Sequence, residues 1–335
     1  MSEEITNGLQ KWWPVLLILA IIIVIVIVLF QRWNFSHLTS RPDPVTTYEE
    51  AVQRIEAVQT TETHLNPLCR TQFLTHGQRT ENTILLVHGY TTCPHQFAEL
   101  GKRFHNLGYN VLIMPLPGHG FVDRMTDAQG QVKAEDFAAY ADKVVDIGQG
   151  LGERVVISGI SLGGAISAWA VQNRSDVDMA MIVSPGFSFE EIPTWAINPI
   201  QNIFVMLPAT YDWWDLELKE NGGPPYAYPR YSKRTLGEIM RLGFAIQEQA
   251  RQAAPLGQAV LVVTNGNDFS VDNDVTHEVI ALWHARGANL STYEFEASLG
   301  LGHDLIDPNS KETDIEIVYP RLIELVNARP DQASR

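Results

Sequence analysis

The sequence predicts an α/β protein in which a mostly parallel central sheet is covered by helices on both faces. Two observations support this prediction. Short, continuously apolar segments alternate with segments of helical pattern, and one apolar segment runs directly into a GISLGG turn. Strands that are buried on both faces of a parallel sheet are continuously apolar, and helical crossovers connect them. Right-handed crossovers then place every loop that follows a strand along one edge of the sheet.

The core elements follow one another from about residue 83 to the end of the chain. Helices are predicted at about 94–107, 134–148 and 275–286, with one more after the GISLGG turn and one at the C-terminus. The sequence GQGLG at 148–152 precedes a strand, which does not suit a phosphate-binding loop. We assign residues 66–335 to this domain. The predicted strands, several of them quoted with the loop or turn that follows, lie in TILLVHG, NVLIMPLPGHG, VVISGISLGG, MAMIVSPG, AVLVVTNGND and LSTYEFEA.

The N-terminal region contains a long apolar segment. After a short tail at 1–11, residues Trp12 to Phe30 carry no charge, and a helix of that length rises about 28 Å, close to the ~30 Å hydrocarbon core of a bilayer. A signal peptide would have a shorter apolar region and a small-residue cleavage site, whereas this chain continues with QRWNFSHL. We therefore predict one transmembrane helix at 12–33.

The flanks of this segment suit a membrane anchor but do not orient it. Tryptophans bracket it, and basic residues can extend to the headgroups at its ends. Lys11 and the N-terminal amine on one side balance Arg32 and Arg41 on the other, so the positive-inside rule assigns no side. The bracketing tryptophans are Trp12, Trp13 and Trp33.

Residues 34–65 are predicted to be a linker and a short helix. Residues 34–46 are polar with two prolines, which suits a spacer between bilayer and domain. Thr47 and Glu50 have the spacing of a capping box at a helix start. Tyr48, Val52 and Ile55 fall on one face of that helix, which we expect to pack on the domain.

An insert from Phe187 to about Pro255 separates two core strands and is rich in aromatic residues. Single aromatic residues usually serve packing, but a whole insert that enters at the loop edge of the sheet suits a cap over a substrate pocket. We therefore expect a cap at about 187–255.

Composition excludes several functional classes. The chain has 39 acidic and 24 basic residues, a net charge of −15 and a pI near 5, which disfavours nucleic acid as a partner. Cys69 and Cys93 lack metal-ligand spacing, and no metal or cofactor is predicted. The sequence leaves open whether Cys69 and Cys93 form a disulfide. A bridge would place the domain outside the cytoplasm, and we favour that side.

Ser161 lies at the centre of the GISLGG turn, between a predicted strand and a predicted helix. A serine at such a turn is held on a strained backbone with its hydroxyl exposed, and the flanking glycines let strand and helix pass closely. An ordinary strand-to-helix turn is the alternative for so short a pattern. The strand before it favours a nucleophile.

A serine nucleophile needs a histidine base and an acid that orients it, in the chain order Ser, Asp, His for this topology. Asp268 follows one late strand and His303 follows the last strand, beside glycines. Asp272 and Asp274 compete for the acid role, but their place at a helix start indicates capping. The remaining histidines, His88 and His119 among them, are predicted to serve loops or surfaces.

Acyl transfer also needs donors for the developing oxyanion. The backbone NH of Leu162, directly after the serine, is one predicted donor. The loop at 88–91, HGYT, follows the first strand and supplies the other, which we assign to the backbone NH of Tyr90.

The segments VHGYTTCP, PLPGHG, GISLGG, NGNDFSVD and GLGHDLID occur in this order, and with them the chain resembles the α/β-hydrolase superfamily over about 66–326. It is similar to bacterial carboxylesterases and to serine hydrolases of the monoacylglycerol-lipase and lysophospholipase type. The resemblance implies a triad of Ser161, Asp268 and His303. The chain differs from many relatives in the Pro115-Leu116-Pro117 segment and in its membrane anchor.

These observations predict a membrane-anchored serine hydrolase that cleaves carboxylic esters through an acyl-enzyme. The apolar cap and the tether suggest a lipid-like substrate such as a monoacylglycerol or a lysophospholipid. An acyltransferase, thioesterase or peptidase could use the same triad, because the first half-reaction is shared. A non-catalytic binding protein on the same scaffold is the third alternative. Protein partners and oligomeric state are not predicted.

Overall fold

The computed structural model describes residues 2–31, 35, 37–214 and 216–328, and it has the predicted α/β architecture. Seven strands form one sheet in the order β1-β3-β2-β4-β5-β8-β9, and all neighbouring pairs are parallel except β1 with β3. The strands are β1 (Gln72–Leu74), β2 (Thr80–Val87), β3 (Asn110–Ile113), β4 (Gly152–Ser161), β5 (Met179–Pro185), β8 (Val260–Asn265) and β9 (Leu290–Phe295).

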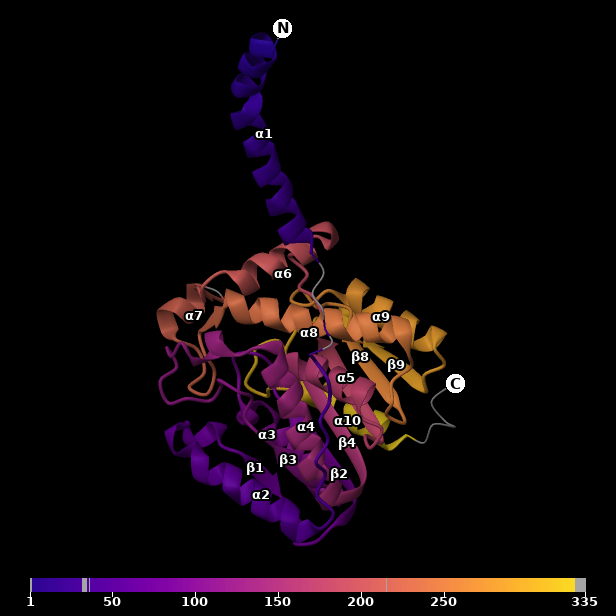
Figure 1. Ribbon diagram of the computed structural model, residues 1–335. Coiled ribbons are helices and arrows are strands. Elements are labelled where there is room, and N and C mark those ends of the chain that lie inside the picture. Colours follow the sequence, from indigo (N-terminus) through magenta and orange to yellow (C-terminus); the bar gives the residue numbers. More distant parts are fainter. Residues whose placement is uncertain (1, 32–34, 36, 215, 329–335) are drawn as a thin grey trace.

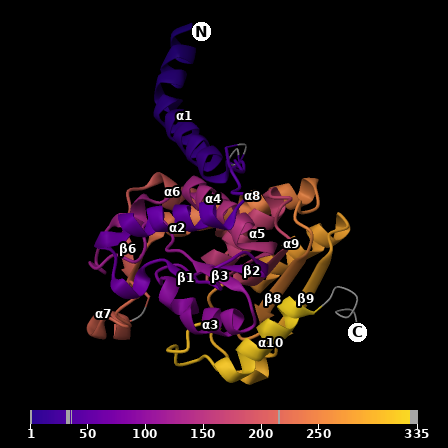
Figure 2. The ribbon, with the colours of Figure 1, turned by 90° about the horizontal axis from the view of Figure 1, so that it is seen from below.

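Helices cover both faces of the sheet (Figures 1 and 2). Along β2, Leu85 and Val87 belong to the apolar core beneath α4, α5, α8 and α9, whereas Ile84 and Leu86 belong to the core beneath α3 and α10. Burial on both faces explains why this strand is continuously apolar. The covering helices are α3 (Ala98–Asn106), α4 (Ala134–Leu151), α5 (Leu162–Asn173), α8 (Lys233–Gln252), α9 (Asn273–Ala285) and α10 (Ile315–Asn327).

Several boundaries differ from the prediction for local reasons. The antiparallel edge strand β1 has only three half-buried residues and so lacks an apolar run. The helix expected at 94–107 begins as a 3-10 turn at Pro94–Phe97. Helix α4 continues to Leu151 and leads directly into β4, where a Cβ on Gly148 would lie 2.8 Å from the Leu85 side chain. Close packing therefore accounts for this glycine of the GQGLG segment.

The short helix α2 (Tyr48–Thr61) starts where the sequence predicts. The Thr47 hydroxyl accepts a hydrogen bond from the Glu50 NH at 3.2 Å. The Glu50 carboxylate, however, accepts from the Thr46 NH at 3.1 Å, so the reciprocal half of the capping box involves a different residue. Ala51 and Ile55 are buried, and this face packs on α4.

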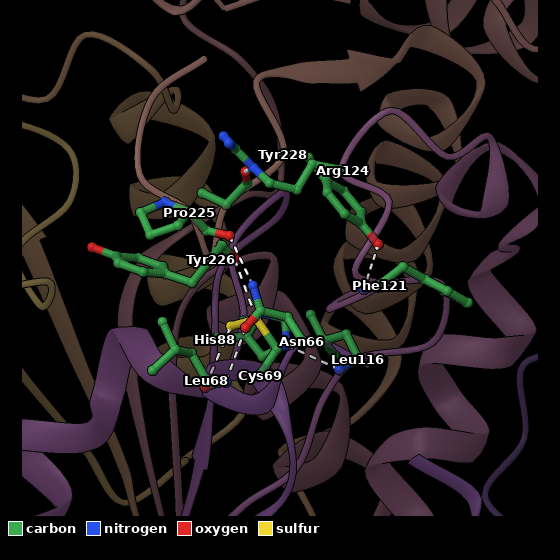
Figure 3. Close-up of a disulfide and its surroundings, with 12 residues drawn as sticks. Asn66, Leu68, Cys69, His88, Leu116, Phe121, Arg124, Pro225, Tyr226 and Tyr228 are labelled. Atoms are coloured by element: carbon green, nitrogen blue, oxygen red, sulfur yellow. Dashed lines mark hydrogen bonds between the residues drawn. A yellow bond between two sulfur atoms is a disulfide. The ribbon is translucent and has the colours of Figure 1, made fainter. Parts of the chain in front are cut away.

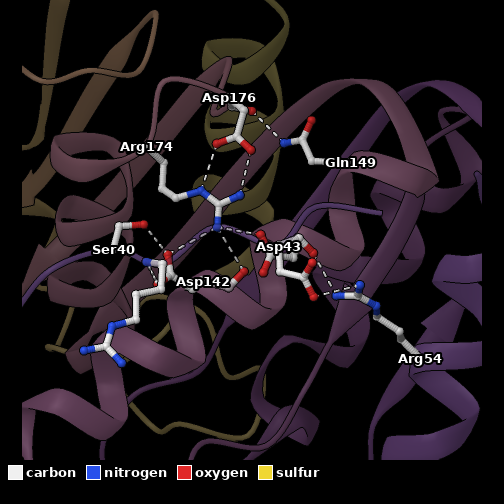
Figure 4. A network of polar contacts seen from close by, with 9 residues as sticks. Ser40, Asp43, Arg54, Asp142, Gln149, Arg174 and Asp176 are labelled. Carbon is white, nitrogen blue, oxygen red and sulfur yellow. Dashed lines mark hydrogen bonds and ion pairs between the residues drawn. The ribbon is translucent and has the colours of Figure 1, made fainter. Parts of the chain in front are cut away.

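Polar contacts hold the segment at 37–46, for which composition suggests a spacer, against the domain (Figure 4). The Arg41 NH donates to Asp142 Oδ2 at 2.7 Å, the Ser40 hydroxyl donates to the same carboxylate, and Leu38 is buried. Asp142 in turn pairs with the fully buried Arg174, at 3.2 Å. Hydrogen bonds to the Asp142 carboxylate thus hold this segment on the domain, although its mostly polar composition does not predict packing.

Helix α1 (Ser2–Phe30) projects from the domain and stands on α6 (Figure 1). Its segment Trp12–Phe30 is long and apolar enough to cross a bilayer, and none of it is buried in the protein. Arg32 and Trp33, which the sequence places at the end of the span, lie outside the described residues.

The insert after β5 has two parts. Helix α8 packs on α6 as well as on α5 and α9, so it joins the insert to the helical layer over the sheet and contributes to the main core. Residues 187–232 remain above the sheet edge. They contain α6 (Ile197–Met206), α7 (Leu216–Asn221) and a two-stranded ribbon of β6 (Tyr211–Trp213) and β7 (Arg230–Ser232).

Candidate active site

Ser161 ends β4 and directly precedes α5, in an unusual backbone conformation with φ 58° and ψ −117°. A positive φ strains a residue that has a Cβ. A Cβ on Gly159 would collide with the backbone of Gly163, and one on Gly163 would collide with the Val87 carbonyl. The glycines on either side of Ser161 therefore allow the sharp turn that the sequence predicts.

His303 and Asp268 are brought together from loops that follow different strands. His303 Nδ1 lies 2.8 Å from Asp268 Oδ2 and 3.0 Å from Oδ1. The Asp268 side chain is fully buried, and its Oδ1 also accepts from the NH groups of Ser270 (2.9 Å) and Val271 (3.2 Å). Because the carboxylate accepts at Nδ1, the proton of neutral His303 is held there and Nε2 keeps its lone pair.

The two groups change each other's pKa. Burial lowers the pKa of His303, but the hydrogen bond and negative charge of Asp268 outweigh it, so the pKa of His303 is raised from its usual value. Burial raises the pKa of Asp268, and the contact with His303 and the NH donors outweigh it, so that pKa is lowered. The pair therefore favours a carboxylate at position 268.

The competing residues have structural roles. Asp272 is the N-cap of α9 and accepts from the NH groups of Asp274 and Val275. His88 Nε2 accepts from the Leu116 NH at 2.9 Å, and burial keeps the pKa of His88 well below its usual value. Burial also lowers the pKa of His119 to about 4, and its Nδ1 lies 2.8 Å from the Pro117 carbonyl oxygen.

The loop after β2 is held by the cap. The Tyr90 hydroxyl donates to Gln129 at 2.6 Å and accepts from the Ser232 NH at 2.9 Å. Thr91 has a positive φ of 62°, and its hydroxyl accepts from Trp214 Nε1 at 2.8 Å. Within the described residues, the Tyr90 NH donates to no protein acceptor. The Leu162 NH is one of the N-terminal donors of α5 that no intrahelical carbonyl satisfies.

A cavity of about 620 Å³ lies between this edge of the sheet and the cap. Ser161 and His303 line it together with Tyr90 and Leu162. The cap and α8 contribute apolar lining residues, namely Phe189, Ile192, Phe204, Leu236 and Ile239. The segment after His303 contributes polar lining residues, namely Asp304, Asp307, Asn309, Ser310 and Glu312.

The family is shown by a sequence match that spans the site. A family model described as serine aminopeptidase, S33, matches residues 78–306. The chain belongs to the S33 family of α/β-hydrolases. A thermostable monoacylglycerol lipase from Bacillus sp. (strain H-257) is 26% identical over 102 residues. These residues are 28% of this chain and 36% of that enzyme, so the match spans little more than a third of the relative.

Solved structures share the fold of this S33 hydrolase at low sequence identity. The monoacylglycerol lipase of Paleococcus ferrophilus is 17% identical with a TM-score of 0.59, over 76% of this chain and 97% of that one. A soluble variant of the monoglyceride lipase of Saccharomyces cerevisiae, in complex with a substrate analog, is 16% identical with a TM-score of 0.58, over 77% and 90%. These similarities confirm the predicted α/β-hydrolase fold.

Sequence reasoning did not single out Gln96, which links two loops of the hydrolase site. Gln96 Oε1 accepts from the Gly89 NH at 2.8 Å, and its Nε2 donates to Asp304 Oδ2 at 2.9 Å. It therefore joins the loop that carries Tyr90 to the residue next to His303. A single glutamine in the 3-10 turn at Pro94–Phe97 has no pattern that would have marked it.

Cys69 and Cys93 form a disulfide, with their Cα atoms 5.2 Å apart (Figure 3). Both residues are buried, and Tyr226 of the cap packs against them. Cys93 lies just after the loop that holds Tyr90, so the bridge fastens the end of this loop to the segment before β1.

Proposed function

We propose that this protein is a membrane-anchored serine hydrolase that cleaves carboxylic esters of lipid-like alcohols or acids through an acyl-enzyme. The observation that carries the proposal is the buried Asp268–His303 pair beside a cavity that Ser161 also lines, with Ser161 on a positive-φ strand-to-helix turn. This combination supplies a nucleophile, a base and a group that orients the base.

In the first half-reaction, Ser161 Oγ attacks the ester carbonyl carbon while His303 Nε2 takes the hydroxyl proton. Asp268 holds the Nδ1 proton and stabilises the imidazolium. The carbonyl oxygen becomes an oxyanion, for which the NH groups of Tyr90 and Leu162 are the proposed donors. The N-terminus of α5 adds a favourable partial charge.

The tetrahedral intermediate collapses when the alcohol leaves and takes the proton from His303, which leaves the acyl group on Ser161. In the second half-reaction, water attacks this ester while His303 accepts one of its protons. Collapse then releases the carboxylic acid and returns the proton to Ser161. The reaction as a whole consumes one water and needs no cofactor.

The cavity supports an amphipathic substrate. Apolar lining residues such as Phe204 and Leu236 suit an acyl chain, and polar lining residues such as Asn309 and Ser310 suit a hydroxylated head group. The similarity to a Bacillus monoacylglycerol lipase points the same way. We therefore propose monoacylglycerols or lysophospholipids as the substrate class.

We propose further that α1 is a membrane anchor and that the domain lies outside the cytoplasm. The uncharged, unburied segment Trp12–Phe30 supports the anchor. The Cys69–Cys93 disulfide supports the side, because disulfides persist in oxidising compartments. Thiol capping of membranes prepared without reductant tests the side. Two free thiols in that experiment would argue against it.

An active-serine probe tests the catalytic proposal. A fluorophosphonate should label the full-length protein in membranes and should fail to label Ser161→Ala. Ser310→Ala is the matched control, since Ser310 also lines the cavity but lies on no strand-to-helix turn, and it should label normally. Equal labelling of wild type and Ser161→Ala would contradict the assignment. A fully unreactive wild type would favour a non-catalytic binding protein.

A peptidase is the second candidate, favoured by the family description and by acidic groups in the cavity, Glu191 and Glu312 among them, that suit a substrate amine. Parallel assays with monoacylglycerols of several chain lengths and with aminoacyl anilides separate the two. Faster turnover of the anilides would replace the esterase proposal. Adding alcohol or thiol acceptors to the same assay reveals acyltransfer, and acyl thioesters reveal thioesterase activity.

A further inference from the structure

The end of α1 is bonded to the cap helix α6. Asn202 Nδ2 donates to the carbonyl oxygens of Leu29 (2.8 Å) and Gln31 (3.0 Å). Asn198 Nδ2 donates to the Phe30 carbonyl oxygen at 3.0 Å. Carbonyls at the end of a helix have no intrahelical partner, so these two asparagines complete the end of α1. The apolar helix and the cap are thereby joined at one place.

The outer side of α6 beside this junction is apolar. Asn198, Asn202 and Met206 recur every four residues and share one stripe of the helix. Between Glu191 and Asp212 the sequence contains no charged residue. We call the exposed apolar residues of this region the docking face, and they are Trp195 (76% exposed), Ile203 (36%), Met206 (57%) and Leu207 (54%).

The length of α1 fixes the height of α6 relative to a bilayer. The segment Trp12–Phe30 rises about 28 Å, which nearly matches a hydrocarbon core of about 30 Å. Its last residue is the one whose carbonyl Asn198 binds, so no stem separates the span from the cap. Further along the chain, the hydrogen bond from the Arg41 NH to Asp142 holds the segment after the span against the domain, so this segment does not act as a free spacer. A helix crossing the bilayer would therefore place α6 at the membrane surface.

We propose that the docking face lies in the interfacial layer of the bilayer that α1 crosses, which holds the cap on the lipid surface. This proposal rests on the membrane-anchor part of the proposed function. A lipid surface fits the face because an uncharged apolar patch enters it without desolvating a charge. Met206 of this face also lies on the same stripe of α6 as Asn198 and Asn202, which bind the end of the span. Phe204 of the same helix lines the cavity, so docking holds one cavity wall next to lipid.

Lipid-borne quenchers test the proposal on the full-length protein in phosphatidylcholine nanodiscs. A nitrobenzoxadiazole label on Met206→Cys reports the docking face, since both native cysteines are bridged and buried. The control is the same label on Ala57→Cys, an exposed position of α2 at the end of the molecule far from α1 (Figure 1). Replacing part of the lipid by nitroxide-labelled phosphatidylcholine should quench the Met206→Cys label at least twofold more than the control.

Two outcomes would overturn the proposal in different ways. Quenching no stronger than in Ala57→Cys, in protein that resists carbonate extraction from membranes, would refute docking and leave the anchor intact. Extraction by carbonate would refute both. Emission that depends on the number of copies per nanodisc but not on the quencher would assign the face to a second copy of the chain. The measurement needs no turnover, so it stands apart from the test of the hydrolase.

Discussion

Replacing Asp268 with asparagine perturbs the proposed base while keeping its size and packing. The side-chain oxygen of asparagine can still accept from the NH groups of Ser270 and Val271. The contact with His303 reverses its direction, because an amide NH₂ group, which donates, would face His303 Nδ1 where the carboxylate now accepts at 2.8 Å. His303 would then carry its proton on Nε2, which is the atom that must receive the Ser161 proton.

This tautomer reversal should lower kcat by about 10⁴, the loss measured for the same substitution in a serine protease triad, or about 5.5 kcal/mol of barrier. The pH profile should also change. Asp268 raises the pKa of His303, so activity of the wild type should fall with decreasing pH through a midpoint above the usual ~6.5. Without the carboxylate, burial lowers the pKa of His303 and the midpoint should move to lower pH.

The assay is steady-state hydrolysis of a soluble nitrophenyl ester across the neutral and weakly acidic range. Asp272→Asn is the matched control, since Asp272 caps α9 and asparagine is an equally good cap. It should keep wild-type activity. If Asp268→Asn stays within tenfold of the wild type, or if Asp272→Asn shows the larger loss, then Asp268 does not orient the base.

Three further predictions concern the disulfide, the Gln96 bridge and the buried pairing of Arg174. Replacing Cys69 and Cys93 with serine opens a loop with a sequence separation of 24 and should lower the free energy of unfolding by about 3.5 kcal/mol. The melting temperature should fall by about 7 °C. An unchanged melting temperature would contradict this prediction. Gln96→Met should lower kcat about tenfold with little change in KM, because the Gly89 NH and Asp304 lose their shared partner. Gln96→Glu keeps the acceptor for the Gly89 NH and should restore only part of the rate. A purely structural role would instead lower stability without lowering kcat relative to KM. Arg174→Met should cost about 3 to 5 kcal/mol in chemical denaturation by leaving buried carboxylates unpaired, and adding Asp142→Asn should recover part of it; full stability of the single variant would refute the pairing.

The sequence was most informative where burial dictates residue type. The strands of the central sheet are buried on both faces, so their apolar runs marked both the strands and the loops that follow them. The order of those loops along the sheet edge is fixed by topology, which is why Asp268 and His303 could be selected from many candidates. The structure brings these two together, and Ser161 lines the same cavity as His303. Their catalytic roles stay predictions.

Features that depend on contacts between distant polar side chains could not be predicted. The Gln96 bridge joins residues that are more than 200 positions apart, and neither end has a periodic pattern. The segment at 37–46 suggested a spacer because polar composition does not reveal that Asp142 offers acceptors to it. The extent of the cap, at about 187–255, stays a prediction, because an amphipathic helix does not show which apolar surface it will cover and α8 contacts α6 as well as α5 and α9.

The cap is bonded both to the apolar N-terminal helix and to the loop that carries Tyr90, and this limits how substrate reaches the cavity. The Tyr228 NH donates to the Thr91 carbonyl oxygen at 2.6 Å, and the Ser232 NH donates to the Tyr90 hydroxyl at 2.9 Å. A cap that swung away in each turnover would break these bonds and release the loop that positions the proposed oxyanion donor. If the cap stays in place in this way, the substrate must enter beside it, and docking on a bilayer would keep the cap at the lipid surface during turnover.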